Sequence, residues 1–239
     1  MTERSFSDRE IGEFDKEAIA AAVRETVALA DRYGAKVVSA TKTVPVEIIN
    51  FAFANGLRYM GENKVQELMD KYDRLDANPG MIHFIGQLQT NKVKYIVGKV
   101  SLIHSLDSLK LAKEISARSK AKGIVTDCLC EINIADEDSK GGIAKEDAEA
   151  FITEASKLDG IRIVGLMSIG PHLEKESDYV PFFTEISGLF KDLSGKGLLG
   201  SKPELSLGMS DNYRLALEYG ATIIRPGTAL FGRRKYPVK

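Results

Sequence analysis

The chain has 239 residues, of which 44% are hydrophobic and 28% are charged, and its formal net charge is −1. This composition excludes collagen, coiled-coil and disordered classes, and the near-neutral charge argues against a protein that mainly coats nucleic acid. No apolar run approaches the ~18 residues that span a bilayer, and the polar N-terminal segment lacks the apolar core of a signal peptide. Two cysteines cannot form a disulfide framework, so we expect a cytoplasmic protein.

Segments with helical spacing of apolar residues alternate with short apolar runs along nearly the whole chain. The first is a helix that Gly34 terminates, and Pro45 opens the next one. In chain order, the pattern predicts helices over 16–33, 46–54, 64–72, 91–97, 108–120, 145–158, 179–193 and 213–219. It predicts strands over 35–40, 57–61, 81–86, 100–104, 125–134, 161–167, 204–208 and 222–231.

Eight strands that each follow a helix favour a parallel sheet with both faces covered. No G-x-G-x-x-G follows a predicted strand, which argues against a dinucleotide-binding doubly wound sheet. We therefore predict an α/β fold with a single TIM-type (β/α)8 barrel and an extra N-terminal helix. The expected domain organisation is a polar tail over residues 1–15 and the barrel over 16–239.

Lys42 follows the first predicted strand, and the carboxyl ends of barrel strands are where the chemistry of this fold collects. A partly desolvated amine at the barrel mouth has a lowered pKa and is a nucleophile suited to a Schiff base with an aldehyde cofactor. A solvated loop lysine fits the same position. Position alone does not decide between the two interpretations.

The ends of the seventh and eighth predicted strands carry the residue types of a phosphate site. The seventh is followed by a glycine turn and a helix for which Ser210 or Asp211 is the predicted N-cap. After the eighth, Gly227 permits a close backbone approach, and Thr228 adds a hydroxyl to the free amides. An ordinary cap or turn explains either segment alone, but their occurrence together at these two loops favours phosphate binding.

The histidines show no spacing typical of a metal site. Alternation along the third strand points His83 towards the barrel interior, where it is either a pocket residue or a packed, hydrogen-bonded core residue. His104 and His172 have no partner pattern. We therefore predict no metal site.

Two further features have ordinary structural explanations. Cys128 and Cys130 face the same side of a buried strand, which is more typical of core thiols than of a redox pair. Lys92, Lys94 and Lys99 form a short basic stretch that a solvated helix face explains better than RNA binding.

Taken together, the motifs of the chain resemble the pyridoxal phosphate homeostasis protein family, single-domain relatives of the alanine racemase N-terminal barrel. The resemblance covers most of the chain, and the ordered set is far more specific than any one motif. The motifs are SATKT at 39–43, MGENKVQE at 60–67, HFIGQLQTNK at 83–92, INI at 132–134, DSKGGI at 138–143, GLMSI at 165–169, LSLGMSD at 205–211 and RPGTALFG at 225–232.

The resemblance implies a TIM barrel that binds pyridoxal 5′-phosphate, with Lys42 as the Schiff-base residue. It also implies two groups of binding residues: Ser210, Arg225, Gly227 and Thr228 for the phosphate, and Asn63, His83 and Met167 along the pocket. Two positions depart from the family pattern. Thr41 replaces a more usual serine, and Pro226 replaces an aliphatic residue and removes one amide from the phosphate loop.

Alanine racemases take a second catalytic group from a C-terminal β-domain, and this chain ends soon after Gly232, so we expect that domain to be absent. We therefore expect a monomeric carrier of pyridoxal phosphate with no catalytic residue, no membrane or nucleic-acid partner, and pyridoxal-phosphate-dependent apoenzymes as recipients. The alternatives are a weak amino-acid racemase and a barrel that binds a phosphorylated metabolite without using an aldehyde.

Overall fold

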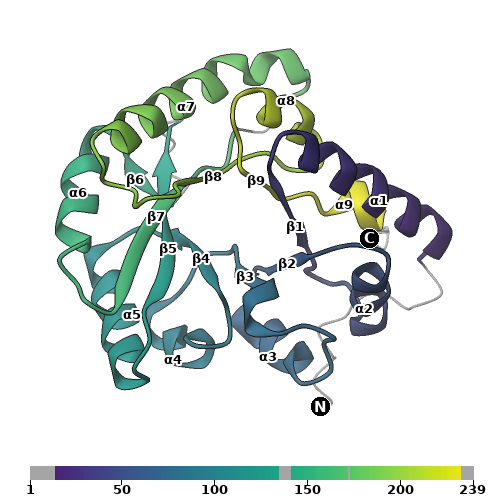
Figure 1. The fold of residues 1–239 in the computed structure, drawn as a ribbon, viewed down its shortest axis with the longest axis horizontal. Coiled ribbons are helices and arrows are strands. Elements are labelled where there is room, and N and C mark those ends of the chain that lie inside the picture. Colours follow the sequence, from purple (N-terminus) through teal and green to yellow (C-terminus); the bar gives the residue numbers. More distant parts are fainter. Residues whose placement is uncertain (1–13, 135–140, 172, 233–239) are drawn as a thin grey trace, which may run out of the picture.

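The computed structural model describes residues 14–134, 141–171 and 173–232, and within them eight parallel strands close into a barrel (Figure 1). Each strand pairs with the next around the ring, and the ring closes because β9 pairs with β1. The predicted TIM-type barrel is confirmed. Its strands are β1 (Lys36–Ala40), β2 (Tyr59–Glu62), β3 (Ile82–Phe84), β4 (Leu102–Leu106), β5 (Thr126–Asn133), β7 (Ile161–Met167), β8 (Glu204–Ser206) and β9 (Ile223–Ile224).

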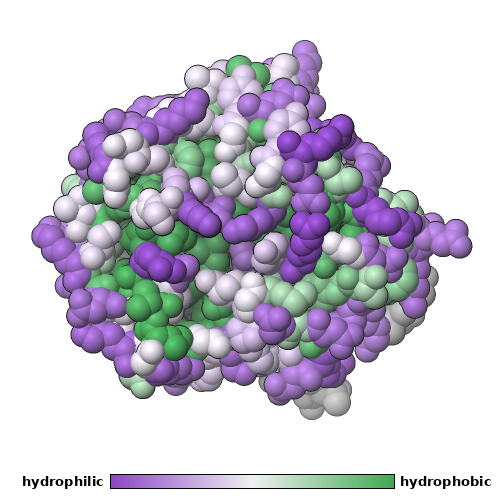
Figure 2. All heavy atoms as spheres, in the orientation of Figure 1, coloured by the Kyte–Doolittle hydropathy of each residue, from purple (hydrophilic) through white to green (hydrophobic). Residues whose placement is uncertain are grey.

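Helices surround the barrel on the outside (Figure 1). They are α1 (Lys16–Arg32), α2 (Val46–Ala54), α3 (Val65–Tyr72), α4 (Val93–Ile96), α5 (Leu109–Ala121), α6 (Ala148–Ala155), α7 (Val180–Gly195), α8 (Tyr213–Glu218) and α9 (Thr228–Phe231). On the face shown in Figure 2, hydrophilic side chains predominate around the rim and apolar side chains are visible further in. None of the helices in the described ranges combines the length and apolar character needed to span a bilayer.

The extra N-terminal helix is α1, and its start is well defined. Asp15 accepts a hydrogen bond from the Ala18 amide at 3.0 Å and caps the helix. Phe14, which precedes it, is buried in the core. Residues 14 and 15 thus belong to the folded unit rather than to the predicted polar tail, whose residues 1–13 lie outside the described part of the chain, as do residues 233–239 of the predicted barrel domain.

Three predicted elements differ from the structure. The strand predicted over 222–231 is wrong in its second half, because β9 ends at Ile224 and Thr228–Phe231 form helix α9. The helices predicted over 91–97 and 145–158 each begin with a 3-10 turn and are shorter than expected. An additional short strand, β6 (Ile143–Ala144), pairs with the end of β5.

The inside of the barrel combines an apolar layer with a chain of polar side chains. Residues such as Val38, Leu129 and Met167 form the apolar layer. Beside it, Nδ1 of His83 lies 2.9 Å from Nε2 of His104, whose Nδ1 lies 3.0 Å from the Ser206 hydroxyl. His83 is therefore a buried and hydrogen-bonded histidine.

Candidate functional site

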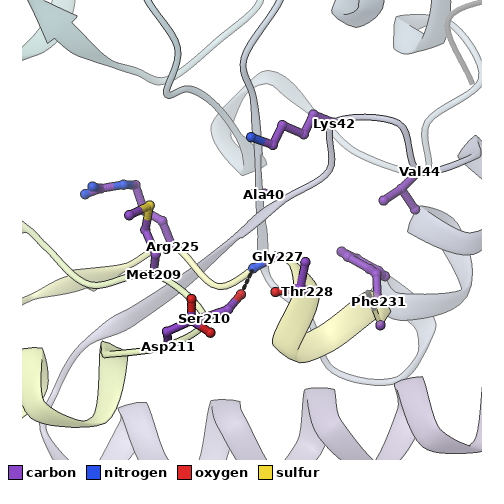
Figure 3. Close-up of a pocket in the computed structure, with 11 residues that line it drawn as sticks. Ala40, Lys42, Val44, Met209, Ser210, Asp211, Arg225, Gly227, Thr228 and Phe231 are labelled. Atoms are coloured by element: carbon purple, nitrogen blue, oxygen red, sulfur yellow. Dashed lines mark hydrogen bonds between the residues drawn. The ribbon is translucent and has the colours of Figure 1, made fainter. Parts of the chain in front are cut away.

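A cavity of about 210 Å³ lies where β1, β8 and β9 end, at the carboxyl ends of the barrel strands (Figure 3). It brings together Lys42, Ser210, Arg225, Gly227 and Thr228, which come from three different loops. The remaining lining residues are Ala40, Val44, Met209, Asp211, Phe231 and Gly232. Five of the eight binding residues that the family resemblance implies thus line one cavity.

Ser210 is held between the loops that follow β8 and β9. Its hydroxyl oxygen accepts hydrogen bonds from the Gly227 amide at 2.9 Å and from the Ala229 amide at 3.1 Å. An oxygen that accepts two such bonds keeps its own proton to donate to a ligand. The hydroxyl of Thr228 lies beside it on the same side of the cavity (Figure 3).

The Ser210 loop owes its shape to Asn212 and Gly208. Asn212, and neither Ser210 nor Asp211, occupies the N-cap position of α8, so the predicted cap is wrong. The Asn212 side chain accepts a hydrogen bond from the Met209 amide at 2.8 Å, which closes the turn that contains Ser210. Gly208 has φ +83°, and a Cβ there would lie 2.7 Å from the Ala216 Cβ, so the turn requires glycine.

Lys42 lies across the cavity from Ser210, Gly227 and Thr228 (Figure 3). It occupies a turn directly after β1 and is exposed, unlike the partly desolvated lysine predicted for the barrel mouth. An amine thus faces a group of hydroxyl and amide donors across a small cavity. This arrangement suits a ligand that carries an electrophilic carbon at one point and an anion at another.

Arg225 uses its guanidinium inside the barrel. It donates to the Ser206 hydroxyl at 2.6 Å and to the Ser168 carbonyl at 2.9 Å. Burial lowers the pKa of Arg225 to about 10, and the nearby Glu131 carboxylate opposes this shift. In Figure 3 the guanidinium points away from Ser210 and Gly227. Arg225 therefore lines one end of the cavity and is separate from the hydroxyl donors at its other side.

The other predicted pocket residues lie elsewhere. Asn63 follows β2, and Met167 is buried inside the barrel. His83 lines a different cavity, of about 410 Å³, together with Lys36 and Tyr59, residues at the amino ends of β1 and β2. None of these three residues is among those that line the cavity of Lys42.

A chain of polar side chains that the sequence pattern did not predict joins His83 to Arg225 through His104 and Ser206. Burial lowers the pKa of His83 to about 3, and it holds the pKa of His104 well below its usual value, so both rings are neutral near pH 7. Alternation along β4 places His104 on the same inward face as Leu102, a signal that could have identified it. In the described ranges, no group of three or more potential metal ligands comes together.

Comparisons with known proteins agree on one family. The sequence-family model for the alanine racemase N-terminal domain matches residues 14–235. The pyridoxal phosphate homeostasis protein of Aquifex aeolicus is 45% identical over 202 residues, which cover 84% of this chain and 88% of the relative. The protein of the same name from Pseudomonas aeruginosa is 37% identical over 221 residues, covering 91% and 94%.

A solved structure shows the same fold with a ligand. PipY of Synechococcus elongatus, determined with pyridoxal phosphate bound, is 30% identical and has a TM-score of 0.82. The match covers 90% of this chain and 100% of PipY.

Proposed function

Because the chain belongs to the alanine racemase N-terminal domain family and, within it, to the pyridoxal phosphate homeostasis proteins, we propose that it binds pyridoxal 5′-phosphate as a Schiff base on Lys42 and carries it in the cell. One observation carries the proposal: Lys42 faces the hydroxyls of Ser210 and Thr228 across a single small cavity (Figure 3). The bound ligand of PipY supports the choice of cofactor.

The side chains present fit this cofactor. When bound, pyridoxal phosphate supplies an aldehyde that condenses with an amine and releases water. Lys42 offers the amine, while Ser210 and Thr228 offer hydroxyl donors to the phosphate. Val44 and Phe231 provide apolar contacts at one end of the cavity (Figure 3). The buried guanidinium of Arg225 adds positive charge at the other end, which favours an anionic ligand.

The exposure of Lys42 favours a carrier over an enzyme. An exposed lysine is accessible to free amino acids and to other proteins, and release of the cofactor to another amine would require such access. The names of the curated relatives denote homeostasis and specify no reaction. The proposal includes a monomeric, cytoplasmic protein that delivers the cofactor to pyridoxal-phosphate-dependent apoenzymes.

An absorption spectrum with chemical trapping tests the attachment. The wild-type protein mixed with pyridoxal phosphate should turn yellow, and borohydride reduction followed by peptide mass spectrometry should locate the cofactor on Lys42. Lys42→Ala should remain colourless, whereas Lys92→Ala, which removes a half-buried lysine from the turn that precedes α4, should behave as the wild type. A colourless wild-type protein, or trapping on another lysine, would overturn the proposed attachment.

Transfer and catalysis are separated by a second measurement. The loaded protein should restore activity to an apoenzyme that depends on pyridoxal phosphate. Steady-state racemisation of free amino acids that disappears in Lys42→Ala would contradict the carrier role and favour an enzyme.

A further inference from the structure

A buried cluster of three ionisable side chains contacts the turn that carries Lys42. Lys71 of α3 donates to Glu62 at 2.8 Å and to Glu67 at 2.7 Å. Glu62 is the last residue of β2, and Glu67 lies one helical turn before Lys71. The exposed fractions of the three residues are 0% for Glu62, 2% for Glu67 and 3% for Lys71. None of the three lines the cavity of Lys42.

The cluster holds the chain on both sides of Lys42. On one side, the ammonium of Lys71 donates its third hydrogen bond to the Thr41 carbonyl at 2.9 Å, and the Thr41 hydroxyl lies 2.7 Å from Oε1 of Glu62. On the other side, the Thr43 amide donates to the Glu67 carboxylate at 2.5 Å. The residue before Lys42 is thus bonded to Lys71 and Glu62, and the residue after it to Glu67. Lys42 itself extends from the turn towards the cavity (Figure 3).

The cluster and the turn after β1 contain backbone strain and unpaired buried oxygens, which destabilise the fold and which a purely structural salt bridge does not require. Among the described residues, Thr43 is the only non-glycine residue with a positive φ, +64°, a conformation that β-branched residues rarely adopt. Buried Oε2 of Glu62 and Oγ1 of Thr43 have no hydrogen-bond partner within the described part of the chain. Strain and unpaired groups of this kind are typical of functional sites.

Stability alone is a poor explanation for the cluster. A buried ion pair costs several kcal/mol in lost hydration per ion, and replacement by well-packed apolar residues is often neutral or stabilising. What the charges provide is directed hydrogen bonds to the backbone of one particular turn. A lysine side chain is long and flexible, so a fixed backbone at its base reduces the number of positions that its amine can occupy.

We propose that Glu62, Glu67 and Lys71 are positioning residues for Lys42. They form hydrogen bonds to the residues on both sides of it and so fix the direction in which its side chain points into the cavity. This inference rests on the proposed role of Lys42 and deepens it. The three residues act through the backbone and do not touch the ligand.

Two ligands that differ only at the reacting carbon test the inference. Pyridoxal 5′-phosphate carries the aldehyde, whereas pyridoxine 5′-phosphate carries an alcohol in its place and can use only the non-covalent contacts. In Glu67→Gln, affinity for pyridoxal phosphate should fall by about 10- to 100-fold, as expected for a misplaced reactive group. Affinity for pyridoxine phosphate should stay within about twofold of the wild type. Glu114→Gln, which removes the same charge from an exposed i,i+4 pair on α5, is the matched control.

The apoprotein provides a readout that needs no cofactor. The rate of reductive methylation of Lys42 by formaldehyde, measured by mass spectrometry relative to Lys92, should change in Glu67→Gln and not in Glu114→Gln. If Glu67→Gln fails to fold, the triple variant Glu62→Gln/Glu67→Gln/Lys71→Met, which removes the whole cluster without leaving a lone buried charge, takes its place.

Each outcome has a definite meaning. Loss of both ligands to the same extent, or a lower melting temperature with unchanged binding of both ligands and unchanged methylation, overturns the positioning role. A wild-type protein that forms no covalent adduct overturns the proposed function of Lys42 instead, and the methylation rates then still decide whether the cluster positions this lysine.

Discussion

The hydroxyl oxygen of Ser210 lies 2.9 Å from the backbone nitrogen of Gly227, so two residues 17 positions apart join the loops after β8 and β9. The Ala229 amide donates to the same oxygen at 3.1 Å. The two loops that face Lys42 are therefore linked to each other before any ligand binds. An anion that accepts a hydrogen bond from the Ser210 hydroxyl would contact a donor whose position is already fixed by two backbone amides.

Ser210→Ala should weaken the binding of pyridoxal phosphate by about 10- to 100-fold, because a hydrogen bond to a charged group contributes about 1.5–3 kcal/mol. Binding of pyridoxal, which lacks the phosphate, should be nearly unchanged. Absorbance titrations with the two ligands measure the difference. Ser177→Ala, which removes an exposed hydroxyl bonded to Asp178, is the control. An equal loss for both ligands would show that Ser210 does not act on the phosphate.

Gly86→Ala should destabilise the protein by about 1–3 kcal/mol, the usual cost of overpacking. A Cβ at position 86 would lie 2.2 Å from the Asn63 carbonyl oxygen, so the loops after β2 and β3 would have to separate. Gly188→Ala is the matched control, because a Cβ there meets nothing within 4 Å and the residue is in the interior of α7. That control should stabilise the protein by about 1 kcal/mol. Urea denaturation of both variants checks the prediction, and similar changes in both would contradict it.

The buried histidines should make stability fall as the pH falls below about 6.5. Burial lowers the pKa of His83 to about 3 and that of His104 well below 6.5. Above the unfolded pKa of about 6.5 both rings are neutral in both states, and stability is at its full value. Below it, the unfolded chain binds protons that the folded protein cannot accept, at a cost of about 1.4 kcal/mol per pH unit and histidine. The loss continues until the folded pKa is reached, at about pH 3 for His83.

His104→Asn isolates this effect. The raised pKa values of Glu62 and Glu131 act in the opposite direction, because these carboxyls hold protons in the folded state at pH values where the unfolded chain has lost them. The quantity to measure is therefore the difference between wild type and variant in the free energy of unfolding at pH 7 and at pH 5. The variant should lose less stability than the wild type between the two. An equal loss in both would show that His104 accepts a proton in the folded state.

The barrel could be predicted from the sequence because each of its strands is an apolar run next to a helix-period segment. The prediction failed at 222–231, where apolar residues continue past Gly227 although the backbone turns there into α9. A run as short as residues 229–231 carries no period that separates helix from strand. Pro226 and Gly227 mark the break, because proline and glycine interrupt strands.

The sequence predicts those residues of the candidate site that directly follow a barrel strand. Lys42, Ser210, Gly227 and Thr228 meet because the fold brings the carboxyl ends of β1, β8 and β9 together. The bond between Ser210 and Gly227 was not predictable, because it depends on the packing of two loops. The i,i+4 spacing of Glu67 and Lys71 is visible in the sequence, but most such pairs lie on exposed helix faces. Only the structure shows that this pair is buried.

Thr43→Asn should raise the free energy of unfolding by about 1 kcal/mol. Thr43 has φ +64°, a left-handed conformation that costs about 1–2 kcal/mol for most residues and that asparagine tolerates better. The change keeps the backbone amide that donates to Glu67, and it removes a hydroxyl oxygen that has no partner within the described residues. Urea denaturation at pH 7 measures the effect.

Thr153→Asn is the matched control for this substitution. Thr153 is in α6, where threonine and asparagine have similar helix propensities, and its hydroxyl donates to the Glu149 carbonyl at 2.8 Å. The control should therefore be neutral or slightly destabilising. If Thr43→Asn destabilises the protein as much as the control does, the positive φ of Thr43 imposes no strain, and the turn after β1 holds Lys42 at no conformational cost.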